Sequence, residues 1–117
     1  MHIAINGWFW DRSNTGSGQY TFHLLHNLRR LDSTLELTLI LPPHIKTAED
    51  VPENVNILHT GGIGGNLGKI WFEQRIFPKM VARSGADIAH VPYWGSPLSS
   101  PAKLVTTILD VVPLVMA

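Results

Sequence analysis

Five short apolar segments run through the sequence, and most of them are apolar at consecutive positions rather than at alternate ones. In chain order they are residues 2–6 (HIAIN), 35–41 (LELTLIL), 55–60 (VNILHT), 86–91 (ADIAHV) and 104–112 (LVTTILDVV). Continuous apolar strands are typical of a parallel sheet that is covered on both faces. The five segments therefore predict the strands of such a sheet.

A helix is predicted between the first two of these segments. From Ser17 to Leu31, apolar residues recur at spacings of three and four, which is the period of a helix with one buried face. Arg29 and Arg30 lie near its C-terminal end, where positive charge favours the helix dipole. Asp32 is expected to close the helix.

A second helix is predicted over residues 69–85, which are helical by composition. Pro78 within this segment predicts a kink or a second helix start, because proline cannot donate a backbone hydrogen bond. Gly85 is expected to cap the C-terminal end. The glycine-rich segment before it, residues 61–68 (GGIGGNLG), is expected to form a flexible turn.

The order of these elements predicts the fold class. Strands alternate with helices or long loops, as in α/β proteins, and crossovers between parallel strands are right-handed. We predict a doubly wound, mainly parallel Rossmann-like sheet with strand order 3-2-1-4-5. The 117 residues suffice for one domain and are too few for two.

Composition excludes several classes of function. Nine Lys and Arg residues balance nine Asp and Glu residues, so the chain offers no electrostatic footprint for nucleic acid or for an anionic membrane. The absence of cysteine excludes disulfides and thiolate metal sites. His23 and His26 are three apart on the predicted helix, but no third ligand is evident. We expect no metal and no cofactor.

Nothing in the sequence predicts a membrane span. No apolar run approaches the roughly 20 residues that a bilayer requires. The N-terminal residues 1–7 (MHIAING) read as a strand rather than as a signal peptide. We therefore expect a soluble cytoplasmic protein.

Gly16, Ser17 and Gly18 lie at the start of the first predicted helix. Glycine allows backbone N–H groups to approach an anion closely, and a helix N-terminus carries partial positive charge. This turn is therefore a candidate phosphate site. The alternative is an ordinary strand-to-helix turn in which Ser17 is the N-cap.

In doubly wound sheets, ligands bind in the crevice at the carboxyl ends of the strands. His90 ends the fourth predicted strand, and Asp110 lies toward the end of the fifth. Both are therefore candidate site residues. The alternatives are a packed, hydrogen-bonded histidine and an aspartate that caps the following turn.

Two interpretations are open for the aromatic residues that follow the first strand, and two for one glutamate. Trp8, Phe9 and Trp10 follow the first strand, where they would either stack on a sugar or close the bottom of the core. Glu73 lies in the second helical segment, where we expect a helix-surface or buried hydrogen-bonding role rather than that of a general base.

Four local patterns resemble, in the same order, motifs of retaining glycosyltransferases of the GT-B fold, family 4, especially bacterial mannosyltransferase-like members. Residues 15–21 (TGSGQYT) look like the family's TGIGRYT turn, and residues 71–78 (WFEQRIFP) resemble its WEQ…LP helix with one residue inserted. Residues 85–98 (GADIAHVPYWGSPL) are similar to GADVLHSPHY…PL, and residues 105–114 (VTTILDVVPL) to VVTIHDLIPL.

The resemblance implies the acceptor-side, N-terminal domain of an enzyme that moves a sugar from a nucleotide-sugar to a hydroxyl with retention. The glycine turn, Gly16 to Gly18, would approach the donor diphosphate. Tyr93 and Trp94 would line the acceptor site, for which His90 and Trp10 are further candidates from their positions. Asp110 matches the family's aspartate after the fifth strand and would be catalytic. The implied partners are a nucleotide-sugar and a glycan, lipid or small-molecule acceptor.

The chain departs from the family pattern at two positions and in length. Leu109 stands where the family has a histidine near the reacting sugar, and Gln19 stands where it has an arginine. The family's second domain, which holds the nucleotide-sugar, would follow residue 117. We therefore expect residues 1–117 to be an incomplete N-terminal domain that is inactive by itself. The full-length enzyme would be cytoplasmic or peripheral to a membrane.

Two other classes of function stay open. Residues 13–21 (SNTGSGQYT) also resemble the loop by which flavodoxins hold the phosphate of FMN, and nearby tryptophans could sandwich a flavin ring. Alternatively, the chain is a non-catalytic interaction module. In either case an exposed strand at the edge of the sheet predicts a homodimer.

Overall fold

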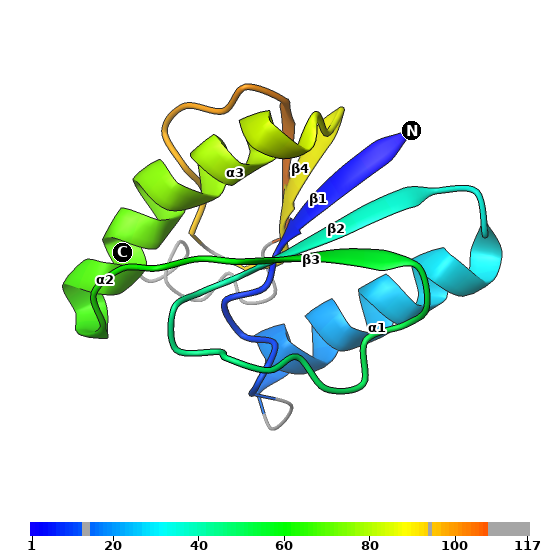
Figure 1. Cartoon of the computed structure of the whole chain (residues 1–117), viewed down its shortest axis with the longest axis horizontal. Helices are drawn as coiled ribbons and strands as arrows, with labels where there is room; N and C mark the ends of the chain where they lie inside the picture. The colour runs from blue at the N-terminus through cyan, green and yellow to red at the C-terminus, as the bar shows by residue number, and fades with distance from the viewer. Residues whose placement is uncertain (13–14, 94, 108–117) are drawn as a thin grey trace, which may run out of the picture.

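The computed structural model describes residues 1–12, 15–93 and 95–107, and it shows an α/β fold (Figure 1). Its elements are β1 (His2–Asn6), α1 (Gly16–Leu31), β2 (Glu36–Leu41), β3 (Val55–His59), α2 (Gly65–Trp71), the π-helical turn η1 (Phe72–Ile76), α3 (Phe77–Ser84), β4 (Ile88–Val91) and β5 (Lys103–Thr106). All strand pairs are parallel, and the order is β3-β2-β1-β4-β5. The predicted fold class and strand order are confirmed.

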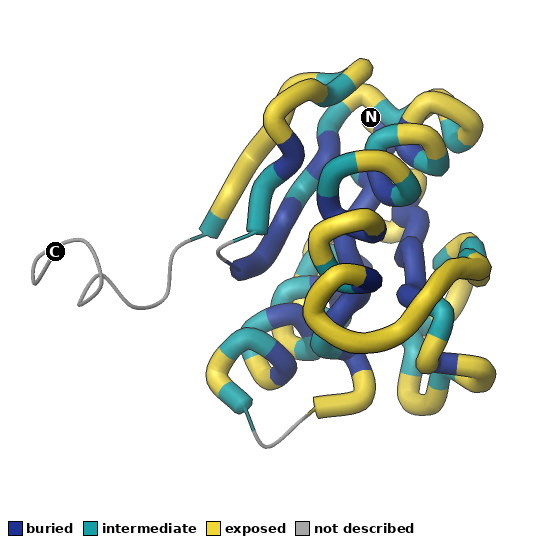
Figure 2. The backbone as a smooth tube through the Cα atoms, turned by 90° about the vertical axis from the view of Figure 1, so that its left-hand side faces the viewer, coloured by how far each residue is buried: buried dark blue, intermediate teal, exposed yellow. Residues whose placement is uncertain are grey.

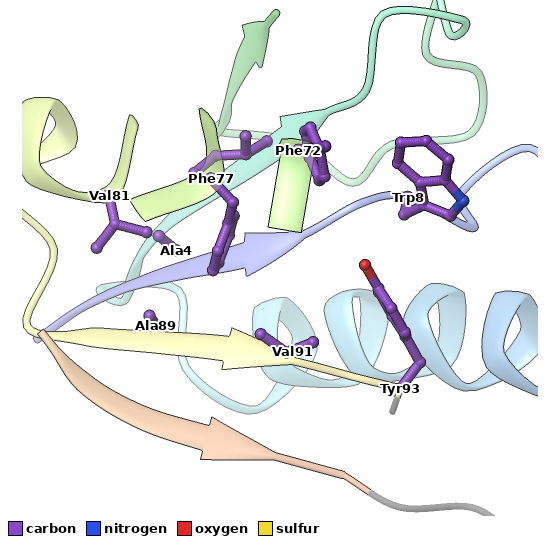
Figure 3. Packing of buried hydrophobic residues seen from close by; sticks show 9 residues of the cluster. Ala4, Trp8, Phe72, Phe77, Val81, Ala89, Val91 and Tyr93 are labelled. Carbon is purple, nitrogen blue, oxygen red and sulfur yellow. The ribbon is translucent and has the colours of Figure 1, made fainter. Parts of the chain in front are cut away.

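Helices cover both faces of the sheet (Figure 1). Since successive side chains of a strand point to opposite faces, neighbouring residues of β1 belong to different cores. Ala4 packs on the α3 side with Phe72 and Phe77, as Figure 3 shows. Ile5 packs on the α1 side with Leu25 and the inward-facing leucines of β2. This double coverage explains why β1 and β2 read as almost continuous apolar runs.

Helix α1 begins one residue before the predicted start, and its N-cap is Thr15. The Thr15 hydroxyl oxygen accepts a hydrogen bond from the backbone N–H of Gly18 at 3.0 Å. The interpretation of Ser17 as the N-cap is therefore wrong. At the other end, Asp32 is the C-cap, as expected. The buried guanidinium of Arg29 donates hydrogen bonds to the carbonyls of Ser33 and Asn54 and ties the helix end to the next strands.

The second helical segment starts four residues earlier than predicted, because α2 begins at Gly65. The expectation of a flexible turn over residues 61–68 is thus wrong for its second half. A side chain at position 68 would collide with the backbone carbonyl of Ile63, so glycine allows the chain to fold back closely on the helix start. This tertiary contact outweighs the low helix propensity of glycine.

Pro78 coincides with a new helix start, as predicted. It occupies the first turn of α3, where a missing N–H costs nothing, and η1 precedes it with the wider hydrogen bond from Phe77 N–H to the carbonyl of Phe72. Gly85 is the left-handed C-cap with φ of 72°, which confirms the expected cap.

The fifth strand is one exposed edge of the sheet, and β3 is the other. β5 begins one residue earlier than predicted and its four residues are all exposed. The predicted continuation through residues 108–112 lies outside the described residues. No helix in the described part of the chain is both long enough and apolar enough to cross a bilayer.

Gly18 provides a test of how closely loop and helix pack. A Cβ at this position would fall well inside contact distance of the backbone carbonyl of Arg12, whereas one at Gly61 would meet nothing within 4 Å. We expect Gly18→Ala to lower the free energy of unfolding by about 1–3 kcal/mol or more. The control Gly61→Ala should be neutral or slightly stabilising. Urea unfolding measures both, and equal midpoints for the two variants would contradict this account.

Candidate functional site

The carboxyl ends of β1 and β4 are joined by a buried asparagine. The side-chain N–H of Asn6 donates to the hydroxyl of Tyr93 at 3.0 Å, and its side-chain carbonyl accepts from the backbone N–H of Trp8 at 2.9 Å. Asn6 is fully buried, so both ends of its amide need these partners. One side chain thus positions the loop after β1 against the loop after β4.

Tyr93 lies beside an ion pair that the helical segment contributes. Lys69 Nζ is 2.5 Å from Glu73 Oε2, and the glutamate side chain is almost completely buried. The ammonium also lies 4.8 Å from the centre of the Tyr93 ring. Burial raises the pKa of Tyr93 far above its usual range, and the neighbouring Glu73 carboxylate raises it further. Tyr93 is therefore a neutral hydrogen-bonding group rather than a proton acceptor.

An open cleft of about 530 Å³ lies next to this pair. Aromatic rings, cationic side chains and backbone amides meet in its wall, which consists of Trp8, Phe9, Arg12, Pro43, His44, Ile63, Gly64, Gly65, Asn66 and Lys69. Such a combination is suited to a ligand with an apolar face and polar or negatively charged substituents.

The glycine turn presents fewer free donors than the sequence suggests. Gly18 is buried and its N–H is already bound to Thr15, while Gly16 is exposed and Ser17 is half-buried. The N–H groups of the first helical turn have no intrahelical partner. The amides of Gly16 and Ser17 are therefore the ones that remain for an anion, whereas Gly18 serves the packing of the loop.

The first turns of α1 lie beside the tips of β4 and β5. The Thr107 hydroxyl is 2.9 Å from His90 Nε2 and 3.1 Å from the Tyr20 hydroxyl. The Tyr20 and His90 rings are 6.3 Å apart. Burial lowers the pKa of His90, so its neutral form is favoured at neutral pH. Tyr20, two residues after the glycine turn, thus lies beside the end of β4.

Five of the predicted site residues fall into two groups. His90 lies with the first turns of α1, where Gly16, Ser17 and Gly18 are found. Tyr93 belongs to the core on the α3 side, where its ring rises from the end of β4 toward Trp8 (Figure 3).

Trp10 is not in either group. Its indole N–H donates to the carbonyl of Glu49 at 2.9 Å and its ring packs near Phe22, with only 8% of the residue exposed. It lines a second cleft, of about 360 Å³, together with Asp11, Phe22, Thr47, Glu49 and Asp50. Trp94, Leu109 and the predicted catalytic Asp110 lie outside the described residues.

Sequence reasoning missed Lys69 and Arg12 as parts of the cleft wall. The i, i+4 spacing of Lys69 and Glu73 was the available signal, since such pairs meet on a helix. The expected buried hydrogen-bonding role of Glu73 is confirmed by its contact with Lys69. His26, one of the two paired histidines, contacts the carbonyl of Asp50 instead. Within the described ranges, no three His, Asp or Glu side chains gather as metal ligands would.

The ion pair of the cleft wall is expected to depend on both partners. Lys69→Met leaves a buried carboxylate without its cation and should lower the free energy of unfolding by roughly 2 kcal/mol. This is less than the about 3–5 kcal/mol of a fully buried pair, because the lysine is partly exposed. The double variant Lys69→Met/Glu73→Gln should recover most of the loss. Urea unfolding of the single and double variants measures the coupling, and additive losses would contradict it.

The lowered pKa of His90 predicts a pH effect on stability. The unfolded chain takes up a proton near the ordinary value of 6.5, whereas the folded chain does so only at lower pH. Stability should therefore fall as the pH drops through about 6.5. His90→Gln, which keeps a donor for Thr107, should remove this part of the decline. Unfolding at several pH values, with an NMR titration of His90, tests it; titration of His90 at or above 6.5 would refute the assignment.

Comparison of the chain with models of protein families, with curated proteins and with solved structures yields no match in any of the three. The fold and the site geometry therefore carry what can be said of function. They establish a Rossmann-like α/β domain with an all-parallel five-stranded sheet and an open cleft among the loops that follow its strands.

Proposed function

We propose that this chain is the acceptor-side part of a glycosyltransferase that moves a sugar from a nucleotide-sugar to a hydroxyl with retention of configuration. The observation that carries the proposal is the convergence of two structures at one edge of the sheet. These are the exposed start of α1 beside His90, and the aromatic and cationic cleft beside Tyr93. A group-transfer enzyme needs such adjacent sites for an anionic donor and a polar acceptor.

The start of α1 would hold the donor diphosphate. The amides of Gly16 and Ser17 and the partial positive charge of the helix N-terminus favour an anion there. The His90 imidazole and the Tyr20 hydroxyl both contact the Thr107 hydroxyl near the start of α1. These polar groups would be available to a sugar bound beyond the phosphate.

The cleft would receive the acceptor. The rings of Trp8 and Phe9 offer apolar faces against which the C–H groups of a sugar ring can pack, and Arg12 and Lys69 can bind its hydroxyl or charged substituents. Tyr93, with its hydroxyl held by Asn6, supports the wall rather than exchanging protons. From the family resemblance, Trp94 would bind the acceptor and Asp110 would act at the reacting sugar.

The wider proposal follows the family resemblance. A second domain would bind the nucleotide. Residues 1–117 alone should therefore bind a nucleotide-sugar weakly and should not transfer the sugar. The proposed location of the enzyme is the cytoplasm. An edge strand with exposed Leu104 and Val105 is also compatible with a homodimer, which light scattering would detect as a doubled mass.

Amide-resolved NMR titration tests the donor site. GDP-mannose and UDP-glucose should shift the amide resonances of the first turn of α1. Gly16→Pro should weaken the binding about tenfold or more, because it removes one amide that bonds a charged group. Proline is tolerated at the first helical position, and the extended conformation of Thr15 accommodates a following proline.

Gly16→Ala is the matched control, since it keeps the N–H and should bind as the unaltered chain does. Shifts confined to β3 and its loops, or equal affinity of the Pro and Ala variants, would refute the donor site. Bright yellow flavin absorbance of the purified protein would instead favour the FMN-binding alternative.

A further inference from the structure

Four large apolar side chains are exposed together where the second helical segment begins. Ile63, Leu67, Ile70 and Trp71, which we call the apolar tip, are each between 52 and 74% exposed. Leu67, Ile70 and Trp71 follow one another at spacings of three residues and one, which places them on one side of α2, and Ile63 lies just before the helix. Since soluble domains rarely expose such groups contiguously, the tip is a candidate interaction surface.

The apolar tip lies at one end of the molecule. Helix α2 marks that end in Figure 1, and Figure 2 views the structure from the same side, with exposed backbone nearest the viewer. The buried positions of the segment, Gly68, Phe72 and Phe77, face the sheet instead. Nothing in the described part of the chain therefore covers the tip.

A row of basic side chains continues from the tip along the same segment. Arg75, Lys79 and Arg83, which we call the basic row, are all exposed and follow Trp71 at intervals of four residues. The Arg75 guanidinium lies 6.0 Å from the centre of the Trp71 ring, so the row and the tip are in contact.

The balanced total charge, from which we expected no footprint for an anionic membrane, hides an uneven distribution along the chain. Residues 65–84 contain four of the nine Lys and Arg residues but only one of the nine acidic residues. That one, Glu73, is buried and paired with Lys69, so it does not offset the basic row at the surface. The remainder of the chain has five basic and eight acidic residues and is net negative.

We propose that the apolar tip and the basic row together dock on the surface of an anionic lipid bilayer. Tryptophan and aliphatic side chains enter the interface between headgroups and acyl chains, while the basic row pairs with lipid phosphates. A second copy fits less well, because a twofold contact through this surface would bring like charges together. Since no described helix can span a bilayer, the docking is peripheral.

The orientation has a consequence for the acceptor. Ile63 and Gly64 belong both to the neighbourhood of the tip and to the wall of the cleft, so docking brings the mouth of the cleft to the bilayer surface. An acceptor carried by a lipid would reach the cleft without leaving the membrane. This corollary depends on the proposed function, whereas the docking itself does not.

Vesicle co-sedimentation of the whole chain tests the docking. We expect binding to phosphatidylcholine vesicles that contain about one-quarter phosphatidylglycerol, and at least about tenfold weaker binding to pure phosphatidylcholine. Binding should weaken as salt is added. Arg75→Gln and Lys79→Gln should each lower the partition coefficient about fivefold, and Leu67→Ser/Ile70→Ser should lower it further.

Arg30→Gln and Leu31→Ser form the matched control, because both residues are exposed at the far end of α1. Their binding should equal that of the unaltered chain, and circular dichroism checks that all variants fold. The proposal is refuted by lack of binding to anionic vesicles, by equal binding to neutral ones, or by equal losses in control and tip variants. A dimer in light scattering that Leu67→Ser dissociates would likewise refute it in favour of a second copy. None of these outcomes alters the nucleotide-sugar titration, so the two proposals fail separately.

Discussion

Parallel pairing of β1 with both of its neighbours is the constraint on which the rest of the structure depends. β1 hydrogen-bonds β2 on one side and β4 on the other, so the chain winds outward first in one direction and then in the other. Asn6 at the end of β1 and Tyr93 after β4 are hydrogen-bonded at the point where these two directions separate. The right-handed crossovers set α1 on one face and α3 on the other, and both cores follow from that.

Three glycines allow close packing in the loops and helix starts around the site. Gly18 lies against the carbonyl of Arg12, Gly68 against that of Ile63, and Gly95 against the side chains of Glu73 and Tyr93. In each case a Cβ would occupy space already filled. These glycines therefore act first as packing residues, and only Gly16 among those of the α1 turn is exposed to a ligand.

The sheet could be predicted because the sequence patterns that mark its strands are local. Apolar runs mark the strands, and the alternation of strands with helices limits their order, so β1 to β4 were found within two residues of their bounds. The start of α2 was missed because glycine argues against a helix until the contact of Gly68 with Ile63 is known. The N-cap was assigned to Ser17 because both Thr15 and Ser17 are suitable residue types, and only the fold decides between them. Likewise, no local pattern could show that the Lys69 ammonium lies 4.8 Å from the ring centre of Tyr93, which is 24 positions away in the sequence.

The π-helical turn has a consequence for how this chain can vary in length. η1 is wider than a turn of α-helix and holds one residue more. In a regular α-helix, Gly68 and Phe77 are nine residues apart and would point in directions that differ by about 180°. Because η1 absorbs one residue, Gly68 before it and Phe77 and Val81 after it are all buried. The deletion of one residue within η1 would therefore leave a regular α-helix whose two ends keep their buried faces, whereas the insertion of one residue would turn α3 by about 100°. The helical segment can thus lose a residue at this point more readily than it can gain one.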